Sequence, residues 1–338
     1  MKVLRWLGGV FGVLLAIAAI GQISGNQPDR DAVAAARSEL GIELESRRVD
    51  VGEVTLHVVL AGPVDGPPVV LLHGFPEFWY AWRGPMAVLA RAGFRVIVPD
   101  QRGYNASDKP GEVEAYGIEH LAGDIAGLID ALGYREVSLS GHDWGGGVAW
   151  RVVLDYPDKI RRFAVLDTPH PKTFDDYKSD EEAISWYRTF ILLPYLPAWS
   201  ARIANWALLT GSLRDTSQPG TFPEPVMDQF RSAWDRDGAM TSMGAWYRAP
   251  SSVSKNSQRV ATPTLVIVAP NDAYIPGDMT RHSMDYLENG RLLELETGTH
   301  WSIQEQPEKI GKILVDFFGA DPLTSNTLWS STLARDRS

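Results

Sequence analysis

The chain carries a carboxylate at a position where many hydrolases have a nucleophilic serine. Residues 139–146 read LSGHDWGG, which has the form of a strand that turns sharply into a helix, and Asp143 occupies the reactive position of the pattern G-x-S-x-G. An aspartate that begins a helix is usually an N-cap, but the glycines around Asp143 let neighbouring backbone pack closely. A carboxylate that attacks a saturated carbon forms an ester, which water can cleave at the enzyme's own carbonyl. Asp143 therefore predicts substitution at an sp³ carbon through a covalent ester.

An acid and a histidine follow later strand-like segments, in the chain order expected of an α/β-hydrolase. Asp272 comes after the run TLVIV, and His300 follows RLLELE in a Gly-Thr-His-Trp turn. Ligands of open parallel sheets bind beyond the carboxyl ends of the strands, so we expect both residues to meet Asp143 at one edge of a sheet. Asp167 also follows a strand-like segment, in AVLDTP, and is the alternative partner of His300.

Hydrolysis of an ester on Asp143 needs an oxyanion hole, because the ester has an acyl carbon. The segment HGFP at residues 73–76 follows a strand-like run, and the backbone N–H groups of Phe75 and Trp144 are placed to form this hole. We also assign Pro76, in the same turn, to the substrate-binding residues. The sequence contains no metal-ligand cluster and no dinucleotide or phosphate loop, so no metal and no cofactor is expected.

These residues require a sheet whose strand ends meet at one edge, and the sequence predicts one. Continuous apolar runs rich in β-branched residues indicate buried parallel strands, and helical patterns lie between most of them. Strands that alternate with helices predict an α/β fold, here a mostly parallel eight-stranded sheet with helices on both faces. The expected strands are 46–51, 55–62, 68–74, 94–100, 136–141, 161–169, 262–270 and 291–296.

The interval from 168 to 256 has no strand-like segment, and its helical stretches are rich in tryptophan and tyrosine. We interpret it as a helical cap inserted after strand 6, because the sheet pattern resumes afterwards; a separate helical domain is the alternative. The α/β-hydrolase core then comprises residues 41–167 and 257–319, and 320–338 form a C-terminal tail. Apolar side chains of the cap, such as Trp186, Phe190 and Trp246, suggest a hydrophobic pocket.

In-line displacement sends the leaving group away from Asp143, towards the cap. An epoxide oxygen that leaves as an alkoxide must be protonated or hydrogen-bonded, and tyrosine is a suitable donor. A halide would instead need soft N–H donors, such as a tryptophan indole or an asparagine amide. The cap tyrosines are Tyr177, Tyr187, Tyr195 and Tyr247.

The first 25 residues differ from the rest of the chain. Lys2 and Arg5 precede the apolar run at 6–20, which contains the small-residue pattern Ala-Ile-Ala. A basic start, an apolar run and small residues are typical of a secretory signal, whereas a full membrane span needs about 18 or more apolar residues. We expect residues 1–25 to be a signal peptide or a retained membrane anchor. A buried core helix is a third hypothesis. The protein is then exported, or attached to a membrane by its N-terminus. Residues 26–40 are expected to be a linker.

Composition excludes several other classes. The formal net charge is −10, which argues against nucleic-acid binding, since that function needs a basic surface. The chain has no cysteine, which excludes disulfides, thiolate metal sites and cysteine nucleophiles. Nothing in the sequence indicates an oligomeric state.

The motifs together resemble those of α/β-hydrolase-fold epoxide hydrolases over residues 41–319. The run HGFPEFWYAWR at 73–83 is similar to the family's oxyanion loop and the aromatic residues after it. Tyr187 in WYRTFILLP and Tyr247 in AWYRA resemble the family's two cap tyrosines. The resemblance implies hydrolysis of an epoxide to a vicinal diol, with water activated by a histidine–aspartate pair. It assigns the catalytic roles to Asp143, His300, Asp272, Tyr187 and Tyr247.

Two positions depart from the family pattern. Asn105 stands in QRGYNASDKP where the family often has glycine, and Ala245 replaces an asparagine that is common two positions before the second tyrosine. The first is a loop variation with no obvious chemical consequence, and the second bears only on the support of Tyr247.

Two rival functions remain at this point. A haloalkane dehalogenase uses the same aspartate, but commonly has an asparagine where this chain has Phe75, although Trp144 is shared with it. A non-catalytic ligand-binding protein on a hydrolase scaffold is a rival of another class, but it has no use for the His300–Asp272 pair. The expected partners are a small hydrophobic epoxide and water.

Overall fold

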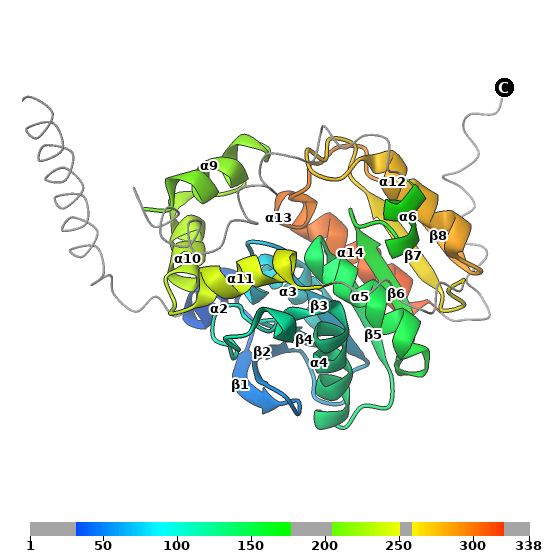
Figure 1. The fold of residues 1–338 in the computed structure, drawn as a ribbon, viewed down its shortest axis with the longest axis horizontal. Helices are drawn as coiled ribbons and strands as arrows, with labels where there is room; N and C mark the ends of the chain where they lie inside the picture. The colour runs from blue at the N-terminus through cyan, green and yellow to red at the C-terminus, as the bar shows by residue number, and fades with distance from the viewer. Residues whose placement is uncertain (1–31, 177–204, 251–258, 321–338) are drawn as a thin grey trace, which may run out of the picture.

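The computed structural model of the chain describes residues 32–176, 205–250 and 259–320. Its centre is an eight-stranded sheet of order β1-β2-β4-β3-β5-β6-β7-β8 (Figure 1). Strand β2 pairs antiparallel with both β1 and β4, and the other neighbours are parallel. All eight strands expected from the sequence are present. They are β1 (Leu44–Asp50), β2 (Thr55–Ala61), β3 (Pro68–Leu72), β4 (Arg95–Pro99), β5 (Val137–His142), β6 (Ile160–Leu166), β7 (Thr264–Val268) and β8 (Gly290–Glu294).

The burial of the central strands explains why their sequences could be recognised as strands. Every residue of β4, β5 and β7 is buried, as expected for parallel strands with helices on both faces. Strand β1, at the sheet edge, instead has four consecutive exposed residues that include Arg47 and Arg48. Charged side chains on an edge strand oppose pairing with another chain.

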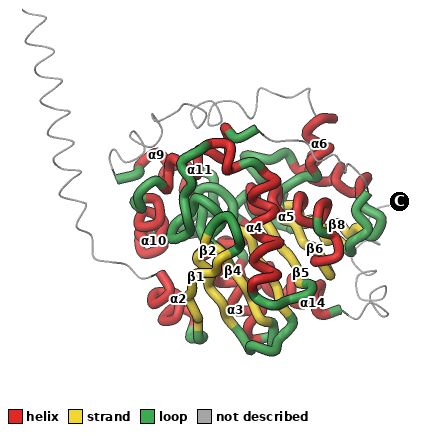
Figure 2. Tube along the Cα trace, turned by 60° about the horizontal axis from the view of Figure 1, so that its bottom comes forward, coloured by secondary structure: helices red, strands yellow, loops and turns green. Residues whose placement is uncertain are grey.

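Helices cover both faces of the sheet. Helices α4 (Ile118–Ala131) and α5 (Trp144–Asp155) pack together in front of the strands in Figures 1 and 2. Helices α3 (Arg83–Arg91) and α14 (Pro307–Gly319) pack closely on each other and form the second layer. Besides α2, which is described below, the core also contains α12 (Gly277–His282), α13 (Ser302–Glu305) and the 3₁₀ turns η1 (Trp79–Trp82), η2 (Val113–Tyr116), η3 (Pro157–Lys159) and η4 (Ser283–Tyr286).

The expected linker at 26–40 is helical in its second part. Helix α2 (Ala32–Leu40) buries Ala36 against the core. Its Glu39 carboxylate accepts hydrogen bonds from the Tyr80 hydroxyl and from Arg83. The helical segment AVAAARSEL is rich in alanine, the strongest helix former, so the helix agrees with local propensity, and its contacts with the core add to its stability.

Between β6 and β7, all the regular elements in the described residues are helices, joined by turns and loops, and no strand lies among these residues. Helix α6 (Pro171–Asp176) contacts α12 of the core. The described part of the expected cap comprises α9 (Ala207–Asp215), α10 (Glu224–Trp234) and α11 (Ala239–Arg248), which lie at the left of Figure 1. Residues 177–204, with Tyr177, Tyr187 and Tyr195, lie outside the described residues, as do 1–25 and 321–338. None of the described helices combines the length and apolar character that crossing a membrane requires.

The contact between α14 and α3 gives a test of core packing. A Cβ added to Gly311 would lie 2.6 Å from Cβ of Val88 in α3, so Gly311→Ala should force the helices apart and destabilise the fold by roughly 1–3 kcal/mol. Gly123 in α4 is the matched control, because the nearest atom to its added Cβ is 3.9 Å away. Gly123→Ala should be neutral or stabilising by up to about 1 kcal/mol. Urea unfolding of both variants measures the difference; equal free energies of unfolding would contradict it.

Candidate active site

Asp143 lies in the sharp turn between β5 and α5, with φ of 51° and ψ of −127°. Residues other than glycine rarely adopt positive φ, and the conformation persists only where the surroundings enforce it. Here the backbone is packed too closely for side chains. A Cβ on Gly141 would lie 2.3 Å from the Gly145 carbonyl oxygen, and one on Gly145 would lie 2.3 Å from that of Leu72. These contacts hold the turn that presents the Asp143 carboxylate.

The two carboxylate oxygens of Asp143 face different groups. Oδ1 accepts a hydrogen bond of 2.7 Å from the Phe75 backbone N–H. Oδ2 lies 3.6 Å from Nε2 of His300. Burial raises the pKa of Asp143, but the neighbouring His300 and the charge of His142 outweigh it, so the pKa falls below its ordinary value. Asp143 is therefore an anion at neutral pH.

His300 is paired with Asp272, as the sequence predicts. Its Nδ1 lies 2.7 Å from Oδ2 of Asp272, whose other oxygen accepts backbone N–H bonds from Tyr274 and Ile275 at 2.7 and 2.9 Å. Burial lowers the pKa of His300. The charge of Asp272 and the hydrogen bonds to Asp143 and Asp272 outweigh this effect and raise the pKa well above its ordinary value. Both carboxylates therefore favour the protonated form of the His300 ring in the free site.

Asp167, the alternative partner, has other contacts. Its Oδ1 accepts a 2.7 Å hydrogen bond from the Ala269 N–H, and its Oδ2 lies 3.4 Å from the Ser302 hydroxyl. Burial, followed by the charge of Asp272, raises the pKa of Asp167 to about 7. Asp272 rather than Asp167 therefore faces Nδ1 of His300.

Aromatic rings surround the nucleophile position. The Tyr247 ring of α11 packs edge-on against Phe75, with centroids 5.3 Å apart, and against Trp144 at 5.0 Å. Trp144 is the first residue of α5, where backbone N–H groups have no partner within the helix. The Pro76 carbonyl accepts a 2.6 Å bond from the Trp234 indole of the cap. Phe75, Pro76, Trp144 and Tyr247 are thus brought together, while Tyr187 lies outside the described residues.

A second buried pair adjoins the first, and sequence reasoning missed it. Oε2 of Glu77 lies 3.3 Å from Nδ1 of His142, and both side chains are 1% exposed. The Glu77 carboxylate also accepts a 2.6 Å bond from the Gln304 amide, and the His142 ring lies 4.6 Å from that of His300. Glu77 ends the motif HGFPE and His142 lies in the motif GHDWG. Nothing in the sequence indicated that the two side chains are in contact.

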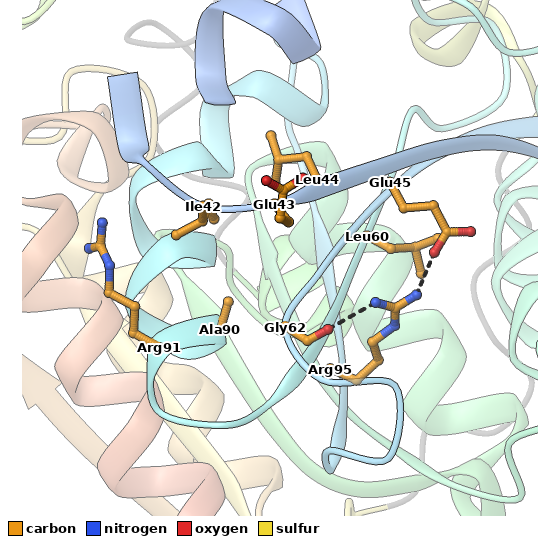
Figure 3. A pocket seen from close by; sticks show the side chains of 9 residues that line it. All are labelled: Ile42, Glu43, Leu44, Glu45, Leu60, Gly62, Ala90, Arg91 and Arg95. Carbon is orange, nitrogen blue, oxygen red and sulfur yellow. Dashed lines mark hydrogen bonds and ion pairs between the residues drawn. The ribbon is translucent and has the colours of Figure 1, made fainter. Parts of the chain in front are cut away.

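Figure 3 shows a pocket of about 420 Å³ that is not this site. It lies beside β1, β2 and α3, and its lining includes Leu44, Leu60 and Ala90 but none of the predicted site residues. Arg95 in this pocket already donates to the Gly62 carbonyl at 3.0 Å and to Glu45 at 2.8 Å. Among the residues that the structure describes, no group of three or more histidines and carboxylates could hold a metal ion.

The charge on Asp143 should be measurable at His300. Because the Asp143 carboxylate contributes to the raised pKa of His300, Asp143→Asn should lower that pKa, since an amide carries no charge. NMR titration of the imidazole resonances in the wild type and the variant measures the change. An unchanged or higher pKa in the variant would contradict the charge coupling.

Comparisons with known proteins identify the same fold as the structure. The family model described as alpha/beta hydrolase fold matches residues 67–307. The AB hydrolase superfamily protein YfhM of Bacillus subtilis is 34% identical over 274 residues, which cover 80% of this chain and 96% of that protein. Human epoxide hydrolase 4 is 32% identical over 291 residues, 82% of this chain and 79% of that protein.

Solved structures of epoxide hydrolases have the same fold. That of VrEH1 from Vigna radiata superposes with a TM-score of 0.70 at 26% identity and covers 82% of this chain and 98% of its own. The Bacillus megaterium enzyme in complex with an inhibitor has a TM-score of 0.73 at 23% identity, with coverage of 81% and 100%. With the matched family model and relatives above 30% identity, the chain belongs to the epoxide hydrolase family of the α/β-hydrolase fold.

Proposed function

We propose that the protein hydrolyses epoxides to vicinal diols through a covalent ester on Asp143. The observation that carries this proposal is the Asp143 carboxylate, with the Phe75 N–H 2.7 Å from Oδ1 and His300 Nε2 3.6 Å from Oδ2. A serine on the same turn would suit acyl transfer, whereas a carboxylate suits attack on saturated carbon.

Ring opening is the first step. Oδ2 of Asp143 attacks one epoxide carbon, the C–O bond of the ring breaks, and the new ester bond forms. The departing oxygen takes a proton from a tyrosine hydroxyl. Tyr247 is supported in this role by its ring contacts with Phe75 and Trp144, which flank the nucleophile. Tyr187 is assigned beside it by resemblance alone.

Hydrolysis of the ester is the second step. His300, oriented by Asp272, takes a proton from water, and the hydroxide adds to the carboxyl carbon of Asp143. The charge that develops on Oδ1 is stabilised by the N–H groups of Phe75 and Trp144. Collapse releases the diol and returns the carboxylate, with the hydroxyl proton of the intermediate passing to the departing oxygen. His300 keeps the proton that it took from water, as in the free enzyme.

Electrostatics separate the two steps. In the free enzyme the Asp143 carboxylate helps to hold the His300 pKa above its ordinary value. Once Asp143 is esterified it carries no charge, so this contribution disappears and the pKa of His300 falls. The proton that His300 holds in the free enzyme then passes to the tyrosine phenolate left by ring opening, and His300 becomes a base at the stage when a base is needed.

The substrate class proposed is a small hydrophobic epoxide. Phe75 and Trp144, which both pack against Tyr247, place apolar rings beside the nucleophile, which favours lipophilic substituents over charged ones. The location of the protein follows only from residues 1–25, so export or N-terminal membrane attachment stays a prediction.

His300→Gln should separate the two steps. Ring opening does not need His300 as a base, so the ester should form and accumulate. Intact-protein mass spectrometry after exposure to an aryl epoxide should show the protein heavier by one substrate, and digestion should locate the mass on the peptide that contains Asp143. His282→Gln is the matched control, because His282 is an exposed histidine of α12; it should turn over without an adduct.

Two results would reject the ester mechanism. One is a His300→Gln protein that binds the epoxide without gaining mass. The other is a label on a peptide without Asp143.

Release of halide from a chloroalkane, without diol from the epoxide, would instead favour a haloalkane dehalogenase, for which Trp144 offers an indole N–H.

Tyr247→Phe should slow ester formation by about 10²- to 10⁴-fold, the usual contribution of general acid assistance. Ester hydrolysis should be less affected, because it depends on His300 and Asp272. Stopped-flow measurement of both rates gives the comparison. Tyr134→Phe is the control, since Tyr134 precedes β5 at the opposite end of the strand from Asp143. Wild-type rates of ring opening in Tyr247→Phe would remove this tyrosine from the mechanism.

A further inference from the structure

Asn105 has a backbone conformation that favours glycine. Its φ is 37°, and it is 7% exposed in the loop that follows β4. Asparagine tolerates positive φ better than most residues, but glycine adopts it without steric cost. The family resemblance also leads one to expect glycine here, so the side chain must supply the reason for asparagine.

The Asn105 side chain bridges the core and the cap. Its Nδ2 donates a 2.7 Å hydrogen bond to Oδ2 of Asp100, and its Oδ1 accepts a 2.6 Å bond from Nε of Arg236. Asp100 follows β4 in the core, while Arg236 lies between α10 and α11 in the cap. Glycine at position 105 could form neither bond.

On the core side, the bridge ends at a fixed carboxylate. Asp100 is fully buried, and its Oδ1 accepts a 3.0 Å bond from the Trp79 backbone N–H. Its Oδ2 also lies 2.7 Å from Nδ1 of His57. Trp79 begins η1, four residues after Phe75, so Asp100 also holds the segment that follows the oxyanion turn.

On the cap side, the bridge reaches the helix that carries Tyr247. Arg236 precedes the first residue of α11 by three positions. The same helix rests on the loop of Asn105 at two more points: the Trp246 indole donates a 3.0 Å bond to the Arg102 carbonyl, and a Cβ on Gly103 would lie 2.9 Å from Cβ of Ser242. The position of α11 is therefore set by this loop.

We propose that Asn105 is a positioning residue that fastens the start of α11 to Asp100 and so sets where Tyr247 lies over Asp143. The proposal rests on the proposed function for its kinetic consequence, although not for the bridge itself. Loss of the bridge should lower the rate of ester formation, which uses the cap tyrosine. It should leave the rate of ester hydrolysis, which uses His300 and water, unchanged.

Asn105→Gly tests the proposal without threatening the fold, since glycine suits φ of 37°. Amide hydrogen exchange of residues 239–248 should become about tenfold faster, as expected when a local anchor is lost. The rate of ester formation with an aryl epoxide should fall about tenfold, because small displacements of a catalytic group are costly. The rate of ester hydrolysis should stay within about twofold of the wild type, and thermal stability should be retained.

Two further variants identify the partner. Arg236→Ala breaks the bridge from the cap side, so it should reproduce both effects, and the double variant with Asn105→Gly should be no worse than either single variant. Arg214→Ala is the matched control, because the hydrogen bonds that Arg214 donates among the described residues go to Phe222 and Glu224, both within the cap. It should leave exchange of 239–248 and ester formation unchanged.

The outcomes distinguish this inference from the proposed function. If exchange of 239–248 in Asn105→Gly equals that of the wild type, or if the two single effects add in full, the positioning role is wrong even where the epoxide is hydrolysed. Equal slowing of both chemical steps would likewise reject it, since a general loss of structure would have that effect. If the wild type forms no ester, the proposed function fails, and the exchange measurement alone decides the role of Asn105.

Discussion

The close approach of backbone segments around Asp143 is the constraint on which the rest of the structure depends. Asp143 can keep φ of 51° only because the strand before it, the helix after it and the β3 end beside it touch at glycines. Gly74 adds to this, since a Cβ there would lie 2.5 Å from Cβ of Asp143. The same contact brings the Phe75 N–H to the carboxylate, so one steric arrangement both presents the nucleophile and supplies its first hydrogen bond.

Buried charge then determines how the surrounding carboxyl groups behave. Asp272 accepts two backbone N–H bonds on one oxygen and faces the His300 ring with the other. Asp167 accepts one backbone N–H bond and has a longer contact with Ser302, and its burial, followed by the charge of Asp272, raises its pKa to about 7. Two adjacent buried carboxylates resist simultaneous ionisation. The number of hydrogen-bond donors therefore decides which aspartate serves His300, although both follow strands.

Much of the fold could be predicted from sequence because buried parallel strands leave a strong signal. The apolar runs of β3, β4, β5 and β7 were all located, and the three residues at strand ends met as expected. Helix α2 was not predicted although its alanine-rich sequence favours a helix. Its contacts through Glu39 with Tyr80 and Arg83, about 40 residues away along the chain, could not be inferred from the sequence. The Glu77–His142 pair and the role of Asn105 were missed for the same reason, since each depends on a partner far along the chain.

The described part of the cap is joined to the core at loops that carry the site. The Trp234 indole binds the Pro76 carbonyl in the oxyanion turn, and the Trp246 indole binds the loop after β4. On the opposite side, the Tyr274 hydroxyl lies 2.9 Å from Ser212 of α9, and the Trp301 indole donates to Thr216 at 2.8 Å. Tyr274 and Trp301 are close neighbours of Asp272 and His300 in the chain, and both rings contact that of His300. A shift of the cap would therefore strain the oxyanion turn and the histidine–aspartate pair together. Because these directional hydrogen bonds fix orientation more strictly than apolar contact does, the position of the cap and the geometry of the reacting groups form a single mechanical unit.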